Sequence, residues 1–263
     1  MERHQAAPIQ AVEPSWEGST FVVLGGSGDI GRDVVRQLAA RKARVVIAGR
    51  DAERLEASAR QARHSATVQL DATDFAAVEA CLRQGHELGE GRLDGVALCV
   101  GSILLKPAHV TSAEEWQQVV ATNLTTAFAV VRAAGKVMRN GGSVVLCSSA
   151  AASVGLANHE AIAAAKAGIE GLVRAAAATH AARGLRFNAV APGLVRTRLA
   201  AGITGNARAL LASERMHPLG RIGEPRDVAT AITWLLGPES AWITGEVLHV
   251  DGGLSRVRPV ERG

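Results

Sequence analysis

The sequence predicts an α/β fold, a single domain in which helices cover both faces of a doubly wound, seven-stranded parallel sheet. Short β-branched runs alternate along the chain with longer Ala-, Leu- and Arg-rich segments of helical period, which is the pattern of repeated β-α-β units. The short runs are apolar at consecutive positions, as expected of strands that are buried on both faces. The 263 residues suffice for one domain of this kind.

Strands and helices are expected in alternation from end to end. The expected strands are Phe21–Leu24, Arg44–Ala48, Thr67–Leu70, Gly95–Val100, Ser143–Cys147, Arg186–Ala191 and Glu246–Val250. The expected helices are Ile30–Ala40, Ala52–Arg63, Phe75–Gln84, Glu114–Val137, His159–Arg183 and Pro225–Leu236. We therefore expect a domain over residues 18–255, a flexible N-terminal extension over 1–17 and a C-terminal tail over 256–263.

Composition argues against two classes of partner. Aromatic residues make up 3% of the chain, and the net charge of +4 is spread without a run of Lys or Arg. Nucleic-acid-binding surfaces combine exposed aromatics with a basic stripe, so no nucleic-acid partner is expected. The apolar runs are far shorter than the roughly 20 residues that cross a bilayer. The first residues also lack a continuous apolar segment, so no membrane association is expected.

The three cysteines, Cys81, Cys99 and Cys147, lie far apart and show no metal-ligand spacing. Buried structural thiols and no metal site are therefore expected. This cysteine usage is typical of a reducing compartment. We expect a cytoplasmic protein.

A glycine-rich turn follows the first expected strand. Gly25, Gly28 and Gly31 form a G-x-x-G-x-x-G pattern immediately before a helix. Glycines let the backbone approach a diphosphate closely, and the helix N-terminus offers unpaired N–H groups with a partial positive charge. The position after the first strand of a β-α-β unit makes this a strong dinucleotide signal.

The end of the second strand bears on the choice of dinucleotide. An acidic residue there would hydrogen-bond the ribose hydroxyls and repel a 2′-phosphate. The chain instead has Arg50 just past the strand, next to Asp51. Because a guanidinium pairs with phosphate, the sequence favours NADP(H) over NAD(H).

Further motifs appear in a fixed order along the chain. With its glycine-rich turn, the chain resembles the short-chain dehydrogenase/reductase family through Asn123, Ser148-Ser149, Lys166, Ala191-Pro192-Gly193 and Val250-Asp251-Gly252-Gly253. The resemblance covers roughly residues 18–255. It implies a single-domain Rossmann fold, usually a homotetramer or homodimer, that binds NAD(P)(H). It also implies hydride transfer between the nicotinamide and a small alcohol or carbonyl substrate.

The resemblance assigns roles to individual positions. Asp71 is similar to the residue that contacts the adenine ring in the family, and Pro192-Gly193 is similar to the turn that lies against the nicotinamide. The resemblance also implies that Val195 and Thr197 lie near the carboxamide and the diphosphate. The expected cofactor-binding residues are Gly25, Ser27, Gly28, Asp29, Ile30, Gly31, Arg50, Asp71, Ala72, Gly101, Lys166, Pro192, Gly193, Val195 and Thr197.

Catalytic roles are likewise implied by the resemblance. Asn123 is similar to the asparagine that bends its helix and holds a water in a proton relay. Ser149 is similar to the serine that hydrogen-bonds the substrate oxygen. Lys166 is similar to the lysine that grips the nicotinamide ribose.

Three departures from the family pattern stand out. Asp29 replaces a glycine of the commoner G-x-x-x-G-x-G spacing and is expected to cap the following helix. The family's Asn-Asn-Ala-Gly reads Leu98-Cys99-Val100-Gly101 here. The third departure is Ile162, which stands four residues before Lys166 and 13 after Ser149, where the family has its acid tyrosine; the chain contains no tyrosine.

An isoleucine cannot protonate the alkoxide that carbonyl reduction leaves, and three interpretations stay open. Another group supplies the proton, with His159 preferred because it lies three residues before Ile162, and Glu160 the weaker alternative. The other reading of His159 is a position in the first turn of a helix capped by Asn158. In the second interpretation the substrate is a conjugated carbonyl, whose reduction gives a stabilised enolate. In the third the chain is a non-catalytic dinucleotide-binding relative, such as a sensor, scaffold or silent subunit.

The segment 194–216 lies where family members carry a mobile lid over the substrate. Arg196, Arg198 and Arg208 in this segment raise the possibility of an anionic substrate, against the alternative that they are solvated surface charges.

Overall fold

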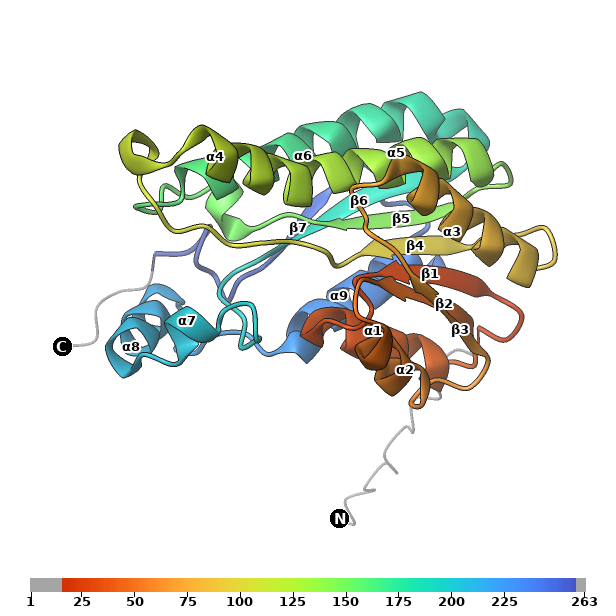
Figure 1. The fold of residues 1–263 in the computed structure, drawn as a ribbon, viewed down its shortest axis with the longest axis horizontal. Coiled ribbons are helices and arrows are strands. Elements are labelled where there is room, and N and C mark those ends of the chain that lie inside the picture. Colours follow the sequence, from red (N-terminus) through yellow and green to blue (C-terminus); the bar gives the residue numbers. More distant parts are fainter. Residues whose placement is uncertain (1–15, 259–263) are drawn as a thin grey trace, which may run out of the picture.

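Seven parallel strands form one sheet in the order β3-β2-β1-β4-β5-β6-β7 (Figure 1). The structure is a computed structural model and describes residues 16–258. The strands are β1 (Thr20–Leu24), β2 (Arg44–Gly49), β3 (Ser65–Gln69), β4 (Gly95–Leu98), β5 (Gly142–Cys147), β6 (Leu185–Pro192) and β7 (Val247–Val250). The strand order reverses beside β1, so the carboxyl ends of β1 and β4 flank the crevice in which such sheets bind ligands.

Helices cover both faces of the sheet, as predicted (Figure 1). One face carries α1 (Asp29–Ala40), α2 (Ala52–Ala59) and α9 (Pro225–Leu236). The other carries α3 (Phe75–Leu88), α4 (Ala113–Val120), α5 (Thr126–Val137) and α6 (Glu160–His180). Two further helices, α7 (Ala201–Thr204) and α8 (Ala207–Met216), lie to one side of the sheet.

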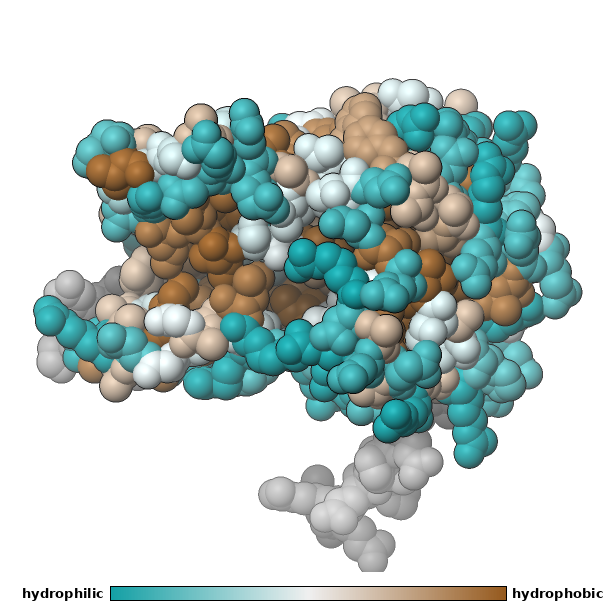
Figure 2. Space-filling model, viewed as in Figure 1, coloured by the Kyte–Doolittle hydropathy of each residue, from teal (hydrophilic) through white to brown (hydrophobic). Residues whose placement is uncertain are grey.

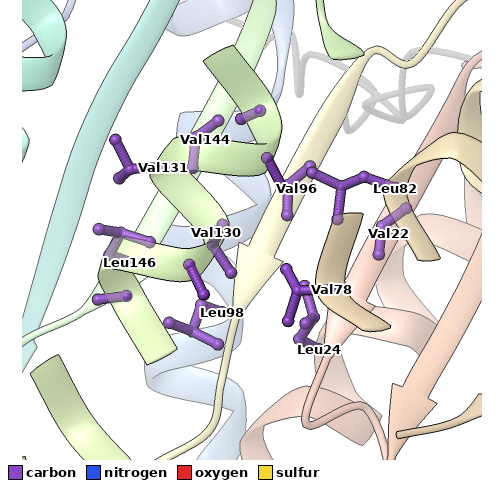
Figure 3. Packing of buried hydrophobic residues seen from close by; sticks show 14 of the residues in the cluster. Val22, Leu24, Val78, Leu82, Val96, Leu98, Val130, Val131, Val144 and Leu146 are labelled. Carbon is purple, nitrogen blue, oxygen red and sulfur yellow. The ribbon is translucent and has the colours of Figure 1, made fainter. Parts of the chain in front are cut away.

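Alternate residues of the five inner strands, β1, β2, β4, β5 and β6, enter two separate hydrophobic cores. Val22 and Leu24 of β1 pack toward α3 and α5, where Val78, Leu82 and Val130 meet them (Figure 3). Phe21 and Val23, from the same strand, belong to the core beneath α1 and α9. Because successive side chains point to opposite faces, a strand between two helical layers must be apolar at every position.

Side-chain caps explain where several helices begin. The Asp51 carboxylate accepts the Arg54 N–H at the start of α2, and Asp74 accepts two N–H groups at the start of α3. Ser112 and Glu115 form a reciprocal capping box at the start of α4. These contacts satisfy N–H groups that the first helical turn leaves unpaired.

The observed elements differ from the predicted ones in a few places. The helix expected over 114–137 is divided into α4 and α5 by one π-helical turn, Ala121–Thr125. Helix α2 ends at Ala59 rather than Arg63, and β3 begins two residues earlier than expected. Helices α7 and α8 were not predicted, because their short, Arg- and Gly-containing segments lack a long apolar period.

The domain begins earlier than residue 18. Trp16 is 6% exposed, its ring centroid lies 5.3 Å from that of Phe21, and its backbone N–H donates to the Arg41 carbonyl oxygen at 2.7 Å. Residues 1–15 of the expected extension and 259–263 of the expected tail lie outside the described residues. Within 16–258, no helix has the length and apolarity to cross a membrane, and no group of acidic, His or Cys side chains could hold a metal.

Candidate active site

The glycine-rich turn between β1 and α1 is closely packed against neighbouring backbone. Gly25 has a φ of +79°, and a Cβ there would lie 2.7 Å from the Cys99 carbonyl carbon. A Cβ on Gly31 would overlap the Gly25 carbonyl oxygen. Only glycine meets both requirements, since other residues rarely adopt this φ and would clash. The turn thus brings backbone to the floor of the crevice at the N-terminus of α1.

A cleft of about 610 Å³ opens above this turn, which is within the usual size of a small-molecule or cofactor site. Its walls come from the turn, the carboxyl ends of β2, β3 and β4, the π-helical turn and the segment after β6. The predicted cofactor-binding residues that line it are Gly25, Ser27, Gly28, Asp29, Ile30, Arg50, Asp71, Ala72, Gly101 and Thr197.

Two arginines line the cleft past the end of β2. Arg50 is exposed, and its carbonyl accepts a hydrogen bond from Gln69 at 3.0 Å, which anchors the backbone beneath it. Asp51 is already engaged, because its carboxylate caps α2 and pairs with Arg54 Nε at 3.2 Å. Arg54 lines the cleft as well and was not predicted. Its signal was available, since it lies one helical turn beyond Arg50.

Asp71 is held as an anion at the end of β3. Its Oδ1 accepts the Thr73 N–H at 2.9 Å and the Thr73 hydroxyl at 2.8 Å. The Thr73 N–H and then its hydroxyl lower the pKa of this carboxyl, while partial burial opposes them. The carboxylate is therefore oriented by its own turn and stands at the cleft beside buried Ala72.

Gly101 connects the cleft to Asn123 and Lys166. A Cβ on Gly101 would lie 3.1 Å from Asn123 Oδ1 and 3.4 Å from Lys166 Nζ. Asn123 is fully buried; its Oδ1 accepts the Ser102 N–H at 3.2 Å, and its Nδ2 donates to the Val119 carbonyl at 2.9 Å. The second bond replaces a helical bond interrupted by the π-helical turn. Asn123 thus ties the π-helical turn to the loop after β4.

Lys166 on α6 is a buried cation with a single described protein acceptor. It is 7% exposed, and its Nζ donates to the Cys147 carbonyl at 2.8 Å. Burial lowers the pKa of this amine, since a low-dielectric environment disfavours the charged form. Burial likewise raises the pKa of the neighbouring Cys99 and Cys147 thiols, so they do not act as counter-ions. An ammonium has three donors, which leaves capacity for oxygen atoms of a ligand at Gly101.

The two serines after β5 have different surroundings. Ser148 is buried, and its hydroxyl donates to Glu170 Oε1 at 2.8 Å. Ser149 is half-buried, and its Oγ accepts the Ala151 N–H at 3.2 Å. Because no acceptor within residues 16–258 takes the Ser149 proton, this hydroxyl can donate to a substrate oxygen.

Ile162 lies in a small apolar cluster and is 4% exposed. Val119, Ala161 and Ala165 are the other buried members, and Leu104 and Leu124 pack against them. Ile162 does not line the cleft described above. The family resemblance predicts a tyrosine at this position. The Ile162 side chain instead fills space between α4 and α6 and offers no proton.

His159 is the N-cap residue of α6 and precedes the helix, so Asn158 is not the cap. Asn158 has a left-handed φ of +64° instead. The His159 Nδ1 lies 2.8 Å from the Ala157 carbonyl oxygen, so Nδ1 carries the hydrogen and Nε2 is left without a described partner. Among the described residues, no hydrogen bond links this ring to Ser149 or Lys166.

The turn after β6 packs against a buried histidine. A Cβ on Gly193 would overlap the His217 ring. His217 Nε2 accepts the Leu194 N–H at 3.2 Å, and its Nδ1 lies 2.6 Å from the Ser213 carbonyl oxygen. Both contacts require the Nδ1–H tautomer. His217 therefore joins the end of α8 to the Pro192-Gly193 turn, a role that the sequence did not reveal.

The prediction that Asp29 caps α1 is wrong. Gly28 is the N-cap residue and Asp29 is the first residue of the helix. Its carboxylate instead accepts the N–H of Arg198 at 2.8 Å and Arg198 Nε at 3.1 Å. Arg196 pairs with Glu224 at 3.1 Å, and Arg208 is exposed. Two of the three arginines considered for an anionic substrate are therefore engaged by protein carboxylates.

Comparison with known proteins agrees with this geometry. A family model described as Enoyl-(Acyl carrier protein) reductase matches residues 26–255. The chain is 37% identical over 243 residues to a cis-4-hydroxycyclohexanecarboxylate dehydrogenase of Sinomonas cyclohexanicum, which covers 90% of this chain and 96% of that protein.

Solved structures agree as well. A short-chain type dehydrogenase/reductase from Mycobacterium ulcerans has a TM-score of 0.86 at 32% identity, over 92% of this chain and 91% of that one. An actinorhodin polyketide ketoreductase variant with NADPH has a TM-score of 0.84 at 26% identity, over 92% and 100% of the two chains.

Proposed function

The chain belongs to the short-chain dehydrogenase/reductase family, and we propose that it is an NADP(H)-dependent oxidoreductase acting on a carbonyl, an alcohol or a conjugated carbonyl compound. The observation that carries the proposal is the buried Lys166 ammonium beside Gly101, at the edge of a cleft that begins at a glycine-rich turn. Burying a cation costs free energy unless other groups pair with it or accept its hydrogen bonds. A ligand whose ends are a diphosphate and a ribose accounts for both features.

The residues present are suited to a nicotinamide dinucleotide. The glycine-rich turn would take the diphosphate, Asp71 and Ala72 the adenine, and Lys166 the nicotinamide ribose. Gly101, which lacks a Cβ, keeps the space between Asn123 and Lys166 open. When bound, the nicotinamide supplies or accepts a hydride.

Arg50 supports the preference for NADP(H). Arg50 and Arg54 both line the cleft near the end of β2, and the nearest acidic residue, Asp51, is occupied by α2 and Arg54. The local field therefore favours the additional 2′-phosphate. The neighbouring ketoreductase structure that contains NADPH is consistent with this assignment.

The chain's own side chains would then orient the substrate. Ser149 donates a hydrogen bond from its hydroxyl to the substrate oxygen, and Asn123 keeps the loop after β4 in place. Ile162 and its apolar neighbours exclude water from the side where a tyrosine is expected. General acid–base catalysis contributes about 10²–10⁴-fold, so reduction of an unactivated ketone is slow.

A conjugated carbonyl is therefore the favoured substrate class. Reduction of its double bond leaves an enolate, whose charge is delocalised and needs no strong acid. Ser149 and water suffice to stabilise and protonate it. His159 is the remaining candidate donor, but its Nε2 carries a proton only in the imidazolium form, because Nδ1 already holds the hydrogen that faces the Ala157 carbonyl oxygen. Nε2 also requires a change of ring position or an intervening water to reach the substrate.

The burial of Ile162 also favours a second candidate function, a dinucleotide-binding relative that does not catalyse the reaction. The two are separated by titrating the protein with NADPH and NADP⁺, followed by a screen of ketones and enones for NADPH oxidation. We expect binding of both nucleotides and faster oxidation with enones than with ketones. Tight binding without turnover of either class would support the second function. Absence of binding below millimolar concentration would remove both.

Family resemblance further leads us to propose a cytoplasmic homotetramer or homodimer. Large apolar side chains exposed on α4 and α5, Trp116 at 45% and Phe128 at 49%, support association of copies. Multi-angle light scattering would show a mass of two or four chains, and a monomer would contradict the proposal.

A further inference from the structure

Hydrogen bonds donated by Arg198 join the glycine-rich turn to the segment that follows β6. The Arg198 N–H donates to Asp29 Oδ2 at 2.8 Å, and Arg198 Nε donates to Asp29 Oδ1 at 3.1 Å. Arg198 Nη2 donates to the Ser27 carbonyl oxygen at 3.1 Å. The two segments are 169 residues apart in sequence, so this contact exists only in the folded chain.

The pair stands on the wall of the dinucleotide cleft. Asp29 and Arg198 both line the cleft, together with Ser27, Gly28 and Thr197. The Asp29 side chain is 23% exposed and that of Arg198 is 47% exposed. Figure 2 shows a hollow between the α4 side of the molecule and the α7–α8 side, with apolar surface along it. The contact ties the beginning of the α7–α8 segment to the β1–α1 turn on the same side of the cleft.

Asp29 creates an electrostatic problem that Arg198 solves. The N-terminus of α1 attracts anions, but the Asp29 carboxylate already places a negative charge there. An unpaired carboxylate at this point would repel the diphosphate of a dinucleotide. Arg198 neutralises it and keeps the N-terminus of α1 attractive to phosphate.

We propose that Asp29 and Arg198 act as one unit in dinucleotide binding, in which Arg198 cancels the Asp29 charge and holds the α7–α8 segment against the glycine-rich turn. The proposal rests on the proposed function. It makes Arg198 a binding residue and Asp29 a residue that positions it.

A second ion pair in the same segment provides the matched control. Arg196 pairs with Glu224 at 3.1 Å, with the two side chains 49% and 53% exposed. Neither of these residues lines the cleft. Exposed pairs of this kind contribute little to stability. Because Glu224 lies outside the cleft, Arg196→Met removes a charge two residues from Arg198 without uncovering a carboxylate at the cleft.

The test is a double-mutant cycle read by nucleotide affinity. NADPH fluorescence gives the dissociation constant for wild type, Arg198→Met, Asp29→Asn, the double variant and Arg196→Met. We expect Arg198→Met to weaken binding about tenfold or more, because the uncovered Asp29 carboxylate would then repel the diphosphate at the N-terminus of α1. Asp29→Asn should weaken it less. The double variant should bind more tightly than Arg198→Met alone, since no uncovered carboxylate remains.

Hydrogen exchange without nucleotide adds a readout that needs no ligand. Amides of residues 197–204 should exchange faster in Asp29→Asn than in wild type or Arg196→Met, because the Arg198 N–H loses its charged acceptor. Equal NADPH affinity in wild type and Arg198→Met, or a double variant as weak as Arg198→Met, would overturn the inference alone. Failure of wild type to bind either nucleotide would overturn the proposed function, and the role of the pair in binding with it.

Discussion

The two ends of the cleft differ in how many of the functional groups expected from the family resemblance are present. At the β1–α1 end, the glycines, Arg50 and the Asp29–Arg198 pair provide close backbone, positive charge and a closing contact. At the α6 end, Lys166 lies beside Gly101 of the cleft, but the position four residues earlier is Ile162, which is buried among apolar side chains and does not line the cleft.

Under the proposed function, dinucleotide binding and proton transfer would therefore depend on separate segments. The turn packs against the backbone of Cys99 and Val100, just past β4, whereas Ile162 packs between α4 and α6. A residue on α6 that donates no proton can therefore replace a tyrosine without disturbing the backbone that would approach the diphosphate. A change at the first end should alter affinity, whereas a change at the second should alter turnover and, at Lys166, affinity as well.

The largest expected effect comes from Lys166→Met, which removes the cation at the α6 end. Loss of the two hydrogen bonds that the Lys166 ammonium would donate to the nicotinamide ribose should lower turnover about 100-fold or more. Stability should not fall, since the variant removes a buried charge whose pKa is already lowered by burial. Steady-state kinetics and thermal unfolding measure the two. A parallel loss of stability would mean that Lys166 is structural.

The next effect should be a gain, from Ile162→Tyr. Restoring a phenol beside Lys166 should raise ketone reduction roughly 10- to 100-fold, below the full value of an acid because the larger ring overpacks the cluster and costs about 1–3 kcal/mol of stability. Ile162→Phe has the same bulk without the hydroxyl and should give no gain. If His159→Ala leaves ketone and enone reduction unchanged, the histidine is not the donor in the wild-type protein.

A smaller effect is expected from Arg50→Ala at the β1–α1 end. Loss of a charged partner for the 2′-phosphate should weaken NADPH binding about tenfold and leave NADH binding nearly unchanged. Fluorescence titration with both nucleotides measures the ratio. Arg83→Ala, at an exposed arginine of α3 that pairs with Glu79, is the control. A preference for NADH in the wild-type protein would contradict the assignment of Arg50.

The smallest expected effect is a pH dependence at Lys166. Its pKa is lowered from 10.5, so ribose binding by the ammonium should weaken a few-fold as pH rises through the folded-state pKa. Between that pKa and 10.5 the unfolded chain binds the extra proton, so stability should increase with pH as affinity decreases. Nucleotide titrations and unfolding curves across alkaline pH measure both. Lys166→Arg stays charged and should abolish the loss of affinity.

The sequence by itself determined the fold class, most of the helices and strands, and the turn that opens the cleft. Consecutive apolar positions revealed strands buried on both faces, and glycine spacing after the first strand revealed the turn. The distances from Ser149 and Lys166 identified Ile162. All of these are local signals, in which residues a few positions apart constrain one another through backbone geometry.

Tertiary structure alone decided which distant groups meet. Asp29 would cap its own helix by local rules, but the folded chain brings Arg198 to it and the carboxylate pairs with that arginine on one wall of the cleft. His217 reaches the Leu194 N–H, and Lys166 finds its acceptor in Cys147, for the same reason. A polar side chain takes the strongest partner that folding places within reach, and for these residues that partner lies too far along the chain for any local pattern to indicate.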